Sequence, residues 1–248
     1  MRRAIISDIH GNYEALRTVL EDIKGQNCDE IVCLGDIIGY GPDPQACLDE
    51  AKNFQICILG NHDLAAIFDP EGFSNAAEKA IHWTRTQIES GDTPEACRER
   101  LSFLAHLPRT HRDGNVLFVH GSVRNPINEY VFPEDVYNKR KMDKLFGMLQ
   151  KVSFQGHTHV PGVFTSEMAF LRPDEIDYRY EIQEAKAMIN VGSVGQPRDG
   201  DWRSCYVILE EPWVYFRRIE YNVDVTVDRI HSLPELDPFL GDRLRDGR

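Results

Sequence analysis

The sequence predicts an α/β fold with α+β elements, and two observations carry this prediction. Up to residue 60, short apolar runs alternate with stretches of helical periodicity, which is the order of a parallel sheet. Beyond residue 150, short strand-like segments are separated by turns, which indicates a largely antiparallel sheet. The 248 residues contain 42% hydrophobic residues and no internal repeat. We therefore expect one domain over residues 1–236.

The first third is predicted to alternate strand and helix. A helix is expected after Asn12, which can cap it, because apolar residues recur at helical spacing at Leu16, Val19, Leu20 and Ile23. A loop rich in Gly and Pro is expected over residues 39–44. The other elements expected here are the strands 4–7, 30–34 and 54–59 and a helix near 44–52.

The remaining elements follow from turn signals and local patterns. Residues 73–106 are expected to form two helices, broken at Gly91-Asp92-Thr93-Pro94. Asp113-Gly114 predicts a hairpin between strands near 109–112 and 115–119. Further strands are expected at 151–156, 162–171, 177–182, 187–191, 204–210 and 213–219, and a helix from Val223 to Leu233. The polar tail 237–248 is expected to fray.

Composition excludes several classes of partner. The net charge of −12 disfavours binding to extended nucleic acid, and the longest basic run, residues 139–141, is expected to be a solvated helix face. No apolar run approaches the roughly 18 residues of a membrane span, and the N-terminus resembles a first strand, not a targeting signal. Six cysteines without CxxC spacing favour a reducing, cytoplasmic location. The composition is also compatible with a homo-oligomer.

Five segments end in residues that bind divalent metals, and each follows an apolar run that resembles a strand. They are Asp8-Ile9-His10, Gly35-Asp36, Gly60-Asn61-His62-Asp63, Val119-His120-Gly121 and Gly156-His157-Thr158-His159. Side chains at the ends of several buried strands can converge on one point. The ligand set contains carboxylates, an amide and imidazoles but no thiolate. Such a set suits a site for Mn²⁺, Fe²⁺, Zn²⁺ or Co²⁺ better than a closed structural zinc site, which is usually rich in Cys. The sequence therefore predicts a metallohydrolase.

Taken singly, these residues also have simpler interpretations. Asp8 or Asp36 could cap a helix or a turn, and His120 could be a satisfied core histidine. The spacing of His157 and His159 favours metal binding more strongly, because residues i and i+2 lie on one face of an extended segment. Five coincidences in order would be needed to explain the whole pattern without a metal site.

The order of the motifs resembles that of the calcineurin-like metallophosphoesterase superfamily, and in particular its small bacterial and archaeal phosphodiesterase group. Segments 8–12, 35–42 and 190–198 fit that group, and the resemblance extends from residue 4 to about 220. It implies two packed mixed β-sheets flanked by helices, an αββα sandwich. It also implies a metal centre at the C-terminal ends of the strands.

The resemblance further implies two divalent metal ions, with Mn²⁺ the expected metal and Fe, Zn, Co or Ni as alternatives. The implied ligands are Asp8, His10 and His159 for one ion, Asn61, His120 and His157 for the other, and Asp36 as the bridge. A bridging carboxylate would offset the repulsion between two ions about 3.5–4 Å apart. A hydroxide bridging both ions would be the nucleophile, its pKa lowered by the paired positive charge.

Four residues are expected to act beside the metals. In the family, the residue at the position of His62 protonates the leaving oxygen and contacts a phosphate oxygen; alternatively His62 is a third metal ligand. Asp63 is expected to accept the other ring proton of His62 and fix its tautomer. Asn61 is expected to contact substrate as well as metal, or to be only a turn residue. Arg198 would bind a phosphate, or else pair with an aspartate that follows it.

The expected function is hydrolysis of a phosphoester, with a diester favoured, on a small phosphorylated substrate. The alternatives are a phosphomonoesterase or a dinucleoside-polyphosphate hydrolase and, from another class, a non-catalytic scaffold on the same fold. The presence of His10, His62, His157 and His159 favours an enzyme. Beyond the segments 64–106 and 121–150, no long insertion offers an obvious substrate domain.

Aromatic residues in and near these segments are candidates for a substrate pocket. Five of them could line a base or aryl pocket, although aromatic residues on helices more often belong to the core. They are Tyr40, Phe68, Phe73, Trp83 and Tyr130.

Overall fold

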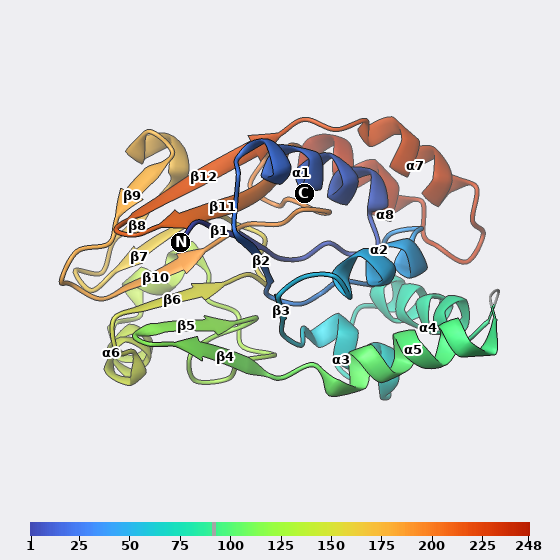
Figure 1. Ribbon diagram of the computed structural model, residues 1–248, viewed down its shortest axis with the longest axis horizontal. Coiled ribbons are helices and arrows are strands. Elements are labelled where there is room, and N and C mark those ends of the chain that lie inside the picture. Colours follow the sequence, from blue (N-terminus) through green and yellow to red (C-terminus); the bar gives the residue numbers. More distant parts are fainter. Residues whose placement is uncertain (91–92) are drawn as a thin grey trace.

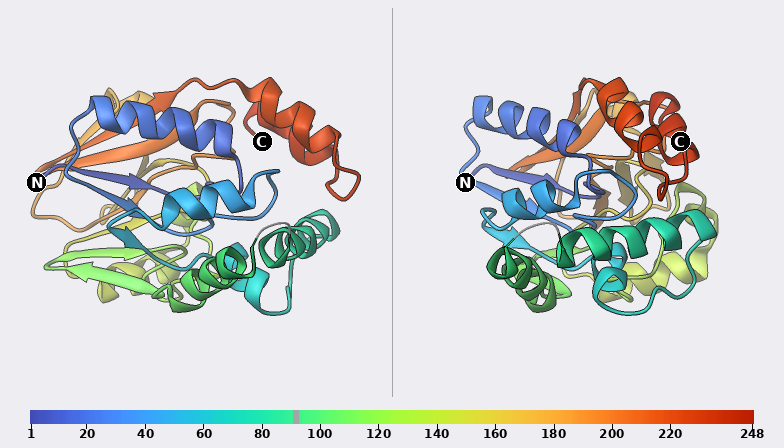
Figure 2. Two further views of the ribbon diagram at one scale, coloured as in Figure 1. Left: turned by 45° about the vertical axis from the view of Figure 1, so that its right-hand side comes forward. Right: turned by 90° about the vertical axis from the view of Figure 1, so that its right-hand side faces the viewer.

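The strands of the protein form two six-stranded sheets that pack face to face. The structure, a computed structural model, describes residues 1–90 and 93–248 (Figure 1). Helix α1 (Tyr13–Gly25) covers the outer face of one sheet, and α6 (Lys139–Met148) lies outside the other. Most remaining helices gather at one end of the sandwich (Figures 1 and 2). The prediction of two mixed sheets flanked by helices is confirmed.

The first sheet has the order β3-β2-β1-β11-β12-β9. The strands β1 (Arg3–Ile6), β2 (Glu30–Cys33) and β3 (Ile56–Cys57) are parallel, as the alternating sequence predicts. The antiparallel strands are β11 (Ser204–Glu210), β12 (Trp213–Ile219) and β9 (Arg179–Glu181). Strand β3 is shorter than the predicted 54–59, because only two of its residues pair with β2.

The second sheet has the order β4-β5-β6-β10-β7-β8. Its strands are β4 (Thr110–Asp113), β5 (Val116–Val119), β6 (Val152–Gln155), β10 (Ala187–Asn190), β7 (Gly162–Thr165) and β8 (Phe170–Leu171). The hairpin at Asp113-Gly114 is confirmed. The strands predicted to form one largely antiparallel sheet beyond residue 150 are divided between the two sheets, and β6 and β10 among them are parallel, with β6 also parallel to β5. Strand β10 follows β6 only after β7, β8 and β9, so the chain crosses over before it returns to pair with β6.

The predicted strand 162–171 is in fact a hairpin. Strand β7 ends at Thr165, and β8 returns antiparallel to it. The turn between them is closed by hydrogen bonds in both directions between the main chains of Thr165 and Met168–Ala169, and Met168 has a positive φ of 64°. A residue in this left-handed conformation reverses the chain.

The other helices are α2 (Pro44–Ala51), α3 (Asn61–Ile67), α4 (Asn75–Glu89), α5 (Pro94–His106), α7 (Val223–His231) and α8 (Phe239–Asp242). Asn12 caps α1 as predicted, because its Oδ1 accepts a hydrogen bond from the Ala15 N–H at 3.2 Å. The predicted break between α4 and α5 is also found, although Gly91 and Asp92 lie outside the described residues.

Successive side chains of β1 point to opposite faces of the sheet and so belong to two different hydrophobic cores. Ile5 packs with Val32 and Phe154 between the sheets. Ala4 and Ile6 face the opposite side, where they pack against α1. The strands of both sheets are thereby held in a fixed register, and the loops that follow them are held in place.

The C-terminal tail is ordered, so the expectation that residues 237–248 fray is wrong. Helix α8 is followed by a 3₁₀ turn, Arg243–Asp246. Leu240 and Leu244 are only 2% and 3% exposed and pack with Trp83 and Val227. Figure 2 shows α8 beside α7, at the end of the molecule that also carries α4. Two buried leucines four residues apart anchor this segment, most of whose other side chains are exposed.

Two further observations concern the helices and the cysteines. Among the described residues, no helix is both long enough and apolar enough to cross a bilayer. All six cysteines are free thiols.

Candidate metal centre

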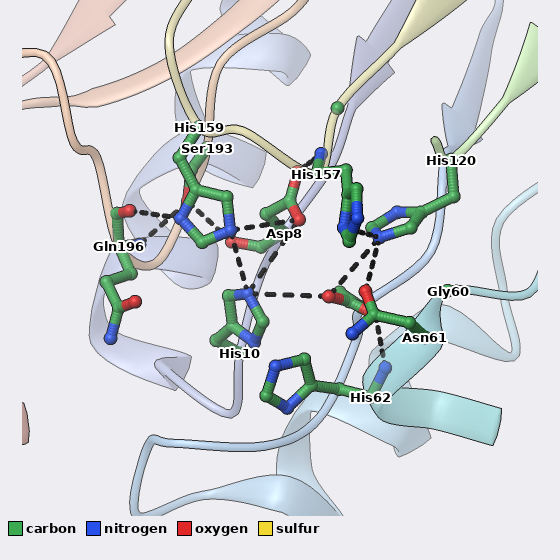
Figure 3. Close-up of polar contacts among 12 residues, drawn as sticks. Asp8, His10, Gly60, Asn61, His62, His120, His157, His159, Ser193 and Gln196 are labelled. Atoms are coloured by element: carbon green, nitrogen blue, oxygen red, sulfur yellow. Dashed lines mark hydrogen bonds and ion pairs between the residues drawn. The ribbon is translucent and has the colours of Figure 1, made fainter. Parts of the chain in front are cut away.

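The predicted ligands come together at the carboxyl ends of the parallel strands (Figure 3). Asp8 and His10 follow β1, and Asp36 follows β2. Asn61 begins α3 after β3, and His120 follows β5. His157 and His159 lie in the loop after β6. Because parallel strands end at the same edge of a sheet, and the two sheets pack face to face, all seven side chains meet.

Three buried side chains form the first cluster: Asp8, His10 and His159. His159 Nε2 lies 3.1 Å from His10 Nε2 and 3.2 Å from Asp8 Oδ1. The separation of Asp8 Oδ1 and His10 Nε2 is 3.7 Å. One carboxylate oxygen and two imidazole nitrogens therefore face a common point, as in a metal site.

The second cluster contains Asp36, His120 and His157, together with Asn61. His120 Nε2 lies 3.0 Å from His157 Nδ1 and 2.9 Å from Asn61 Oδ1. Each side chain is at most 8% exposed. This set offers two imidazoles, an amide oxygen and a carboxylate, which are donors for a divalent transition metal.

Asp36 lies between the two clusters. Its Oδ2 is 3.7 Å from His10 Nε2 in the first cluster and 3.4 Å from His120 Nε2 in the second. Its other oxygen, Oδ1, accepts a hydrogen bond from the His62 main-chain N–H at 2.8 Å. That bond fixes the carboxylate and directs Oδ2 toward both clusters. Oδ2 of Asp36 is therefore close to imidazole nitrogens of both clusters.

Hydrogen bonds orient three of the imidazoles. The Nδ1 atoms of His10, His120 and His159 lie 3.3, 3.0 and 2.5 Å from the main-chain oxygens of Ile38, Leu34 and Gln196. If Nδ1 carries the proton in each ring, Nε2 presents its lone pair to the centre. His157 has the opposite orientation, with Nδ1 facing His120.

The donor set fits divalent cations. Two pairs of imidazole nitrogens face each other at about 3 Å, and the two lone pairs of each pair would repel unless a proton or a cation lies between them. Burial raises the pKa of Asp8 and Asp36, but nearby histidines lower both pKa values by more than burial raises them. The main effect comes from His159 on Asp8 and from His120 on Asp36, and both carboxylates are therefore ionised. Among the described atoms, Asp8 Oδ1 and His157 Nε2 are buried without a hydrogen-bond partner. Cations would satisfy the inward-facing donors.

The backbone at the ligands is conformationally unusual. Five of the seven candidate ligands have positive φ angles between 50° and 67°: Asp8, His10, Asp36, His157 and His159. For residues other than Gly, this left-handed region costs on the order of 1–2 kcal/mol per residue. Such conformations persist where the surrounding structure enforces them and often mark functional sites.

Two glycines of the motifs make room for the carboxylates. A Cβ at Gly60 would collide with Asp36, and one at Gly156 would collide with Ser7 and Asp8. This explains why a glycine precedes Asn61 and why another precedes His157, a requirement that the ligand pattern alone does not reveal.

His62 lies beside the first cluster, with its ring centroid 4.8 Å from that of His10. The rings of Tyr40 and Phe73 flank it at 4.4 and 4.9 Å. Its Nδ1 is buried, with no hydrogen-bond partner among the described residues. Burial lowers the pKa of His62 to about 4, and Arg198 lowers it as well, against the opposing effect of Asp36. His62 with His10 and Asp36 also forms a third group of potential ligand atoms, so ligation remains an alternative.

Asp63 does not accept a proton from the His62 ring, so this prediction is wrong. Its Oδ1 accepts hydrogen bonds from the main-chain N–H groups of Ile37 and Ile38 at 2.9 and 3.3 Å. Its Oδ2 accepts from the Gly60 N–H at 3.1 Å. As the third residue of α3, Asp63 is directed back to the start of the helix, away from the ring of its neighbour.

Arg198 faces the site and does not form the alternative surface ion pair. Its guanidinium lies 5.7 Å from the centre of the Tyr40 ring and donates to Gln196 Oε1 at 2.7 Å. The aspartates that follow it pair elsewhere, Asp199 with Arg218 and Asp201 with Arg203.

Three of the five candidate aromatic residues lie at the site. Tyr40 and Phe73 flank His62, as described, and the Tyr130 ring stacks on that of His157 at 3.6 Å. Phe68 is 63% exposed, and Trp83 packs in the C-terminal core. The role of Gln196, which contacts both His159 and Arg198, was not predicted, although it lies in the motif 190–198.

The fold and the site define a metallohydrolase of the two-sheet type. A profile of the calcineurin-like phosphoesterase superfamily domain matches residues 1–211. The chain therefore belongs to the calcineurin-like phosphoesterase superfamily, as its motifs predict.

Individual relatives support this assignment. An uncharacterized protein of Methanocaldococcus jannaschii is 36% identical and covers 99% of this chain and 98% of its own. A metallophosphoesterase structure from Sphaerobacter thermophilus is 35% identical, covers 100% and 99% of the two chains, and superposes with a TM-score of 0.84. A symmetrical bis(5′-nucleosyl)-tetraphosphatase of Dechloromonas aromatica is 32% identical over 48% of this chain and 42% of its own length.

Proposed function

We propose that the protein hydrolyses phosphodiesters with two divalent metal ions, Mn²⁺ being the expected metal. The observation that carries this proposal is the position of Asp36, whose Oδ2 faces imidazoles of both ligand clusters. Two ions bound there would polarise the phosphoryl oxygens and supply an activated water.

The residues of the chain would bind and orient the substrate. Asn61 and Arg198 are available to contact the phosphate, since Asn61 contacts His120 and Arg198 lies over the Tyr40 ring that flanks His62. In the hydrolysis, a water oxygen bonds to phosphorus, the ester P–O bond breaks, and the leaving oxygen takes a proton. His62 is the proposed donor of that proton.

His62 can donate only when it is protonated. Burial lowers its pKa to about 4 in the protein alone, which makes the ring neutral at pH 7. An anionic phosphate beside the ring favours the imidazolium form. Protonation of His62 would therefore be coupled to substrate binding.

A diester is favoured over a monoester for an electrostatic reason. The net charge of −12 repels a dianionic monoester more strongly at long range than a monoanionic diester. A dinucleoside-polyphosphate hydrolase is the second candidate, because the chain shares 32% identity with a bis(5′-nucleosyl)-tetraphosphatase over about half its length.

The test is a comparison of bis(4-nitrophenyl) phosphate with 4-nitrophenyl phosphate, using protein loaded with Mn²⁺. We expect a higher kcat/KM for the diester. An equal or higher value for the monoester would refute the diester preference and leave the hydrolase class intact. Absence of turnover of any mono-, di- or polyphosphate ester, with both ions bound, would favour the non-catalytic scaffold.

We further propose that the protein acts in the cytoplasm on a small substrate. Six free thiols, including the buried Cys33, suit a reducing compartment.

A further inference from the structure

His157 differs from the other candidate ligand histidines in how its ring is held. Each of the other three rings has Nδ1 at 2.5–3.3 Å from a main-chain oxygen, which leaves Nε2 for a metal. His157 presents Nδ1 to the centre instead, and its Nε2 is buried with no hydrogen-bond partner among the described residues. Outside the centre itself, no hydrogen bond of residues 1–90 and 93–248 therefore orients this ring.

Tyr130 makes the contact that restricts the plane of the His157 ring. The two rings stack, with centroids 3.6 Å apart and planes inclined by only 18°. The lone pair of Nδ1 lies in the plane of the imidazole, so a contact that fixes this plane also directs the lone pair. The Tyr130 ring thus has the orienting effect that a main-chain oxygen has on each of the other three imidazoles.

The position of Tyr130 is itself fixed by its main chain and by both of its neighbours. Its carbonyl oxygen accepts a hydrogen bond from Lys141 Nζ at 2.7 Å. On one side, Glu129 accepts a hydrogen bond from Ser122 Oγ at 2.5 Å. On the other side, Val131 is 1% exposed and packs with residues of β5 and α6. A residue that is 40% exposed is therefore held in one place.

Two more features of this segment keep Tyr130 beside the metal centre. Gly121 follows the candidate ligand His120, and a Cβ at Gly121 would lie only 2.9 Å from the main-chain oxygen of Glu129. The absence of a side chain at Gly121 therefore lets the residue before Tyr130 approach the ligand strand. The ring of Phe132 also stacks on that of Tyr130, with centroids 5.3 Å apart and planes inclined by 6°.

We propose that Tyr130 is a positioning residue for the metal ion of the second cluster, because it holds the His157 imidazole in the orientation that binds the ion. The segment 121–150, which contributes no candidate ligand, would in this way complete the metal site. The inference rests on the proposed function only in so far as His157 binds a metal. Tyr130 acts through His157 and takes no part in the bond changes of hydrolysis.

Metal binding by metal-free protein tests the proposal without turnover. Calorimetric titration with Mn²⁺ gives a Kd for each ion. We expect Tyr130→Leu to raise one of the two Kd values about tenfold or more, since loss of a group that supports a ligand usually lowers metal affinity about 10–100-fold. The other Kd should be unchanged. Tyr130→Phe keeps the ring and should bind both ions as the wild type does.

Nuclear magnetic resonance of protein labelled with ¹⁵N-histidine identifies the affected site. The ion is Zn²⁺, which is diamagnetic, and a spectrum of His157→Gln assigns the His157 signals. In Tyr130→Leu, these signals should reach their metal-bound positions only at a higher Zn²⁺ concentration than in the wild type or in Tyr130→Phe. The signals of His10, in the first cluster, should respond to Zn²⁺ as in the wild type, which also shows that the variant is folded.

Tyr137→Leu is the matched control. It is the same substitution in the same segment, at a position that is 89% exposed. It should leave both Kd values and the His157 signals unchanged. An effect equal to that of Tyr130→Leu would show that the segment tolerates no such change and would refute a specific role of the Tyr130 ring.

The outcomes separate this inference from the proposed function. If wild-type protein binds two ions but hydrolyses no phosphoester, the proposed function fails, and the Tyr130 variants still test the positioning role. If Tyr130→Leu binds both ions as tightly as the wild type, or if Tyr130→Phe weakens binding as much as Tyr130→Leu does, the ring does not position His157. The same conclusion follows if Tyr130→Leu weakens both ions equally, or if Zn²⁺ leaves the wild-type His157 signals unchanged.

Discussion

The main-chain N–H of His157 donates a hydrogen bond to Oδ2 of Asp8 at 2.9 Å. His157 follows β6 of the second sheet, and Asp8 follows β1 of the first. This hydrogen bond therefore joins a candidate ligand of the first cluster to a candidate ligand of the second, across the space between the two sheets. The equivalent bond from the His62 N–H to Asp36 Oδ1, at 2.8 Å, ties α3 to β2. These two bonds hold the carboxylates so that one oxygen of each remains available to a metal.

Removal of metal should destabilise the protein. We expect about two divalent ions per chain by elemental analysis, and a lower melting temperature after chelation. Ions that bind only the folded state stabilise it by about 2.7 kcal/mol each at a concentration one hundred times Kd. Re-addition of Mn²⁺ should restore the melting temperature. One tightly bound ion with full activity at one equivalent would contradict the binuclear proposal.

Asp36→Asn should cost more activity than the replacement of any other single ligand. The amide removes a negative charge that faces both clusters, whereas Asp8→Asn removes one from the first cluster only. Metal content measured after gel filtration should therefore fall for both ions in Asp36→Asn and mainly for one in Asp8→Asn. Equal metal content in the two variants would argue against a bridging position.

His62→Gln should reduce hydrolysis of alkyl diesters more than that of nitrophenyl diesters. Glutamine keeps a polar side chain but cannot donate a proton as an acid, and the loss of a general acid costs on the order of 10²–10⁴ in rate. A nitrophenolate leaves readily without a proton, so its ester should be less affected. The measurement is kcat for both substrates, with metal content as the control. Loss of an ion, or an equal decrease for both substrates, would exclude the acid role.

Asp63→Asn should lower stability, because Asp63 accepts three main-chain hydrogen bonds in a fully buried position. In the variant, an amide NH₂ must face a main-chain N–H. We expect a loss of about 1–3 kcal/mol in the free energy of unfolding, measured in urea. Asp69→Asn, at an exposed position, is the control. An unchanged stability would contradict the structural role of these three hydrogen bonds.

Leu240→Ala should destabilise the protein by about 2–5 kcal/mol, the usual cost of truncating a buried leucine. Leu240 is 2% exposed, whereas its neighbour Phe239 is 58% exposed. Phe239→Ala is therefore the matched control and should cost much less. Equal, small effects of the two substitutions on the urea midpoint would show that the C-terminal segment is frayed in solution.

The ligand types, their order and the strands that precede them are readable from the amino-acid sequence alone. A strand followed by Asp-Ile-His or His-Thr-His is a local pattern, and local patterns are readable without the fold. The fold class and the parallel order of β1, β2 and β3 followed in the same way, because helices between strands imply parallel crossovers.

The groups that each side chain contacts depend on long-range packing, which the sequence pattern does not reveal. Asp63 is adjacent to His62 in sequence but bonds to main-chain groups of residues 37, 38 and 60. Strands β5, β6 and β10 are parallel although their sequences do not show it. Residues 237–248 are polar by composition, yet Leu240 and Leu244 bind them to a core that α4 and α7 provide. In each case the group that the residue contacts lies far away in sequence or one helix turn away. A local sequence pattern does not identify that contact.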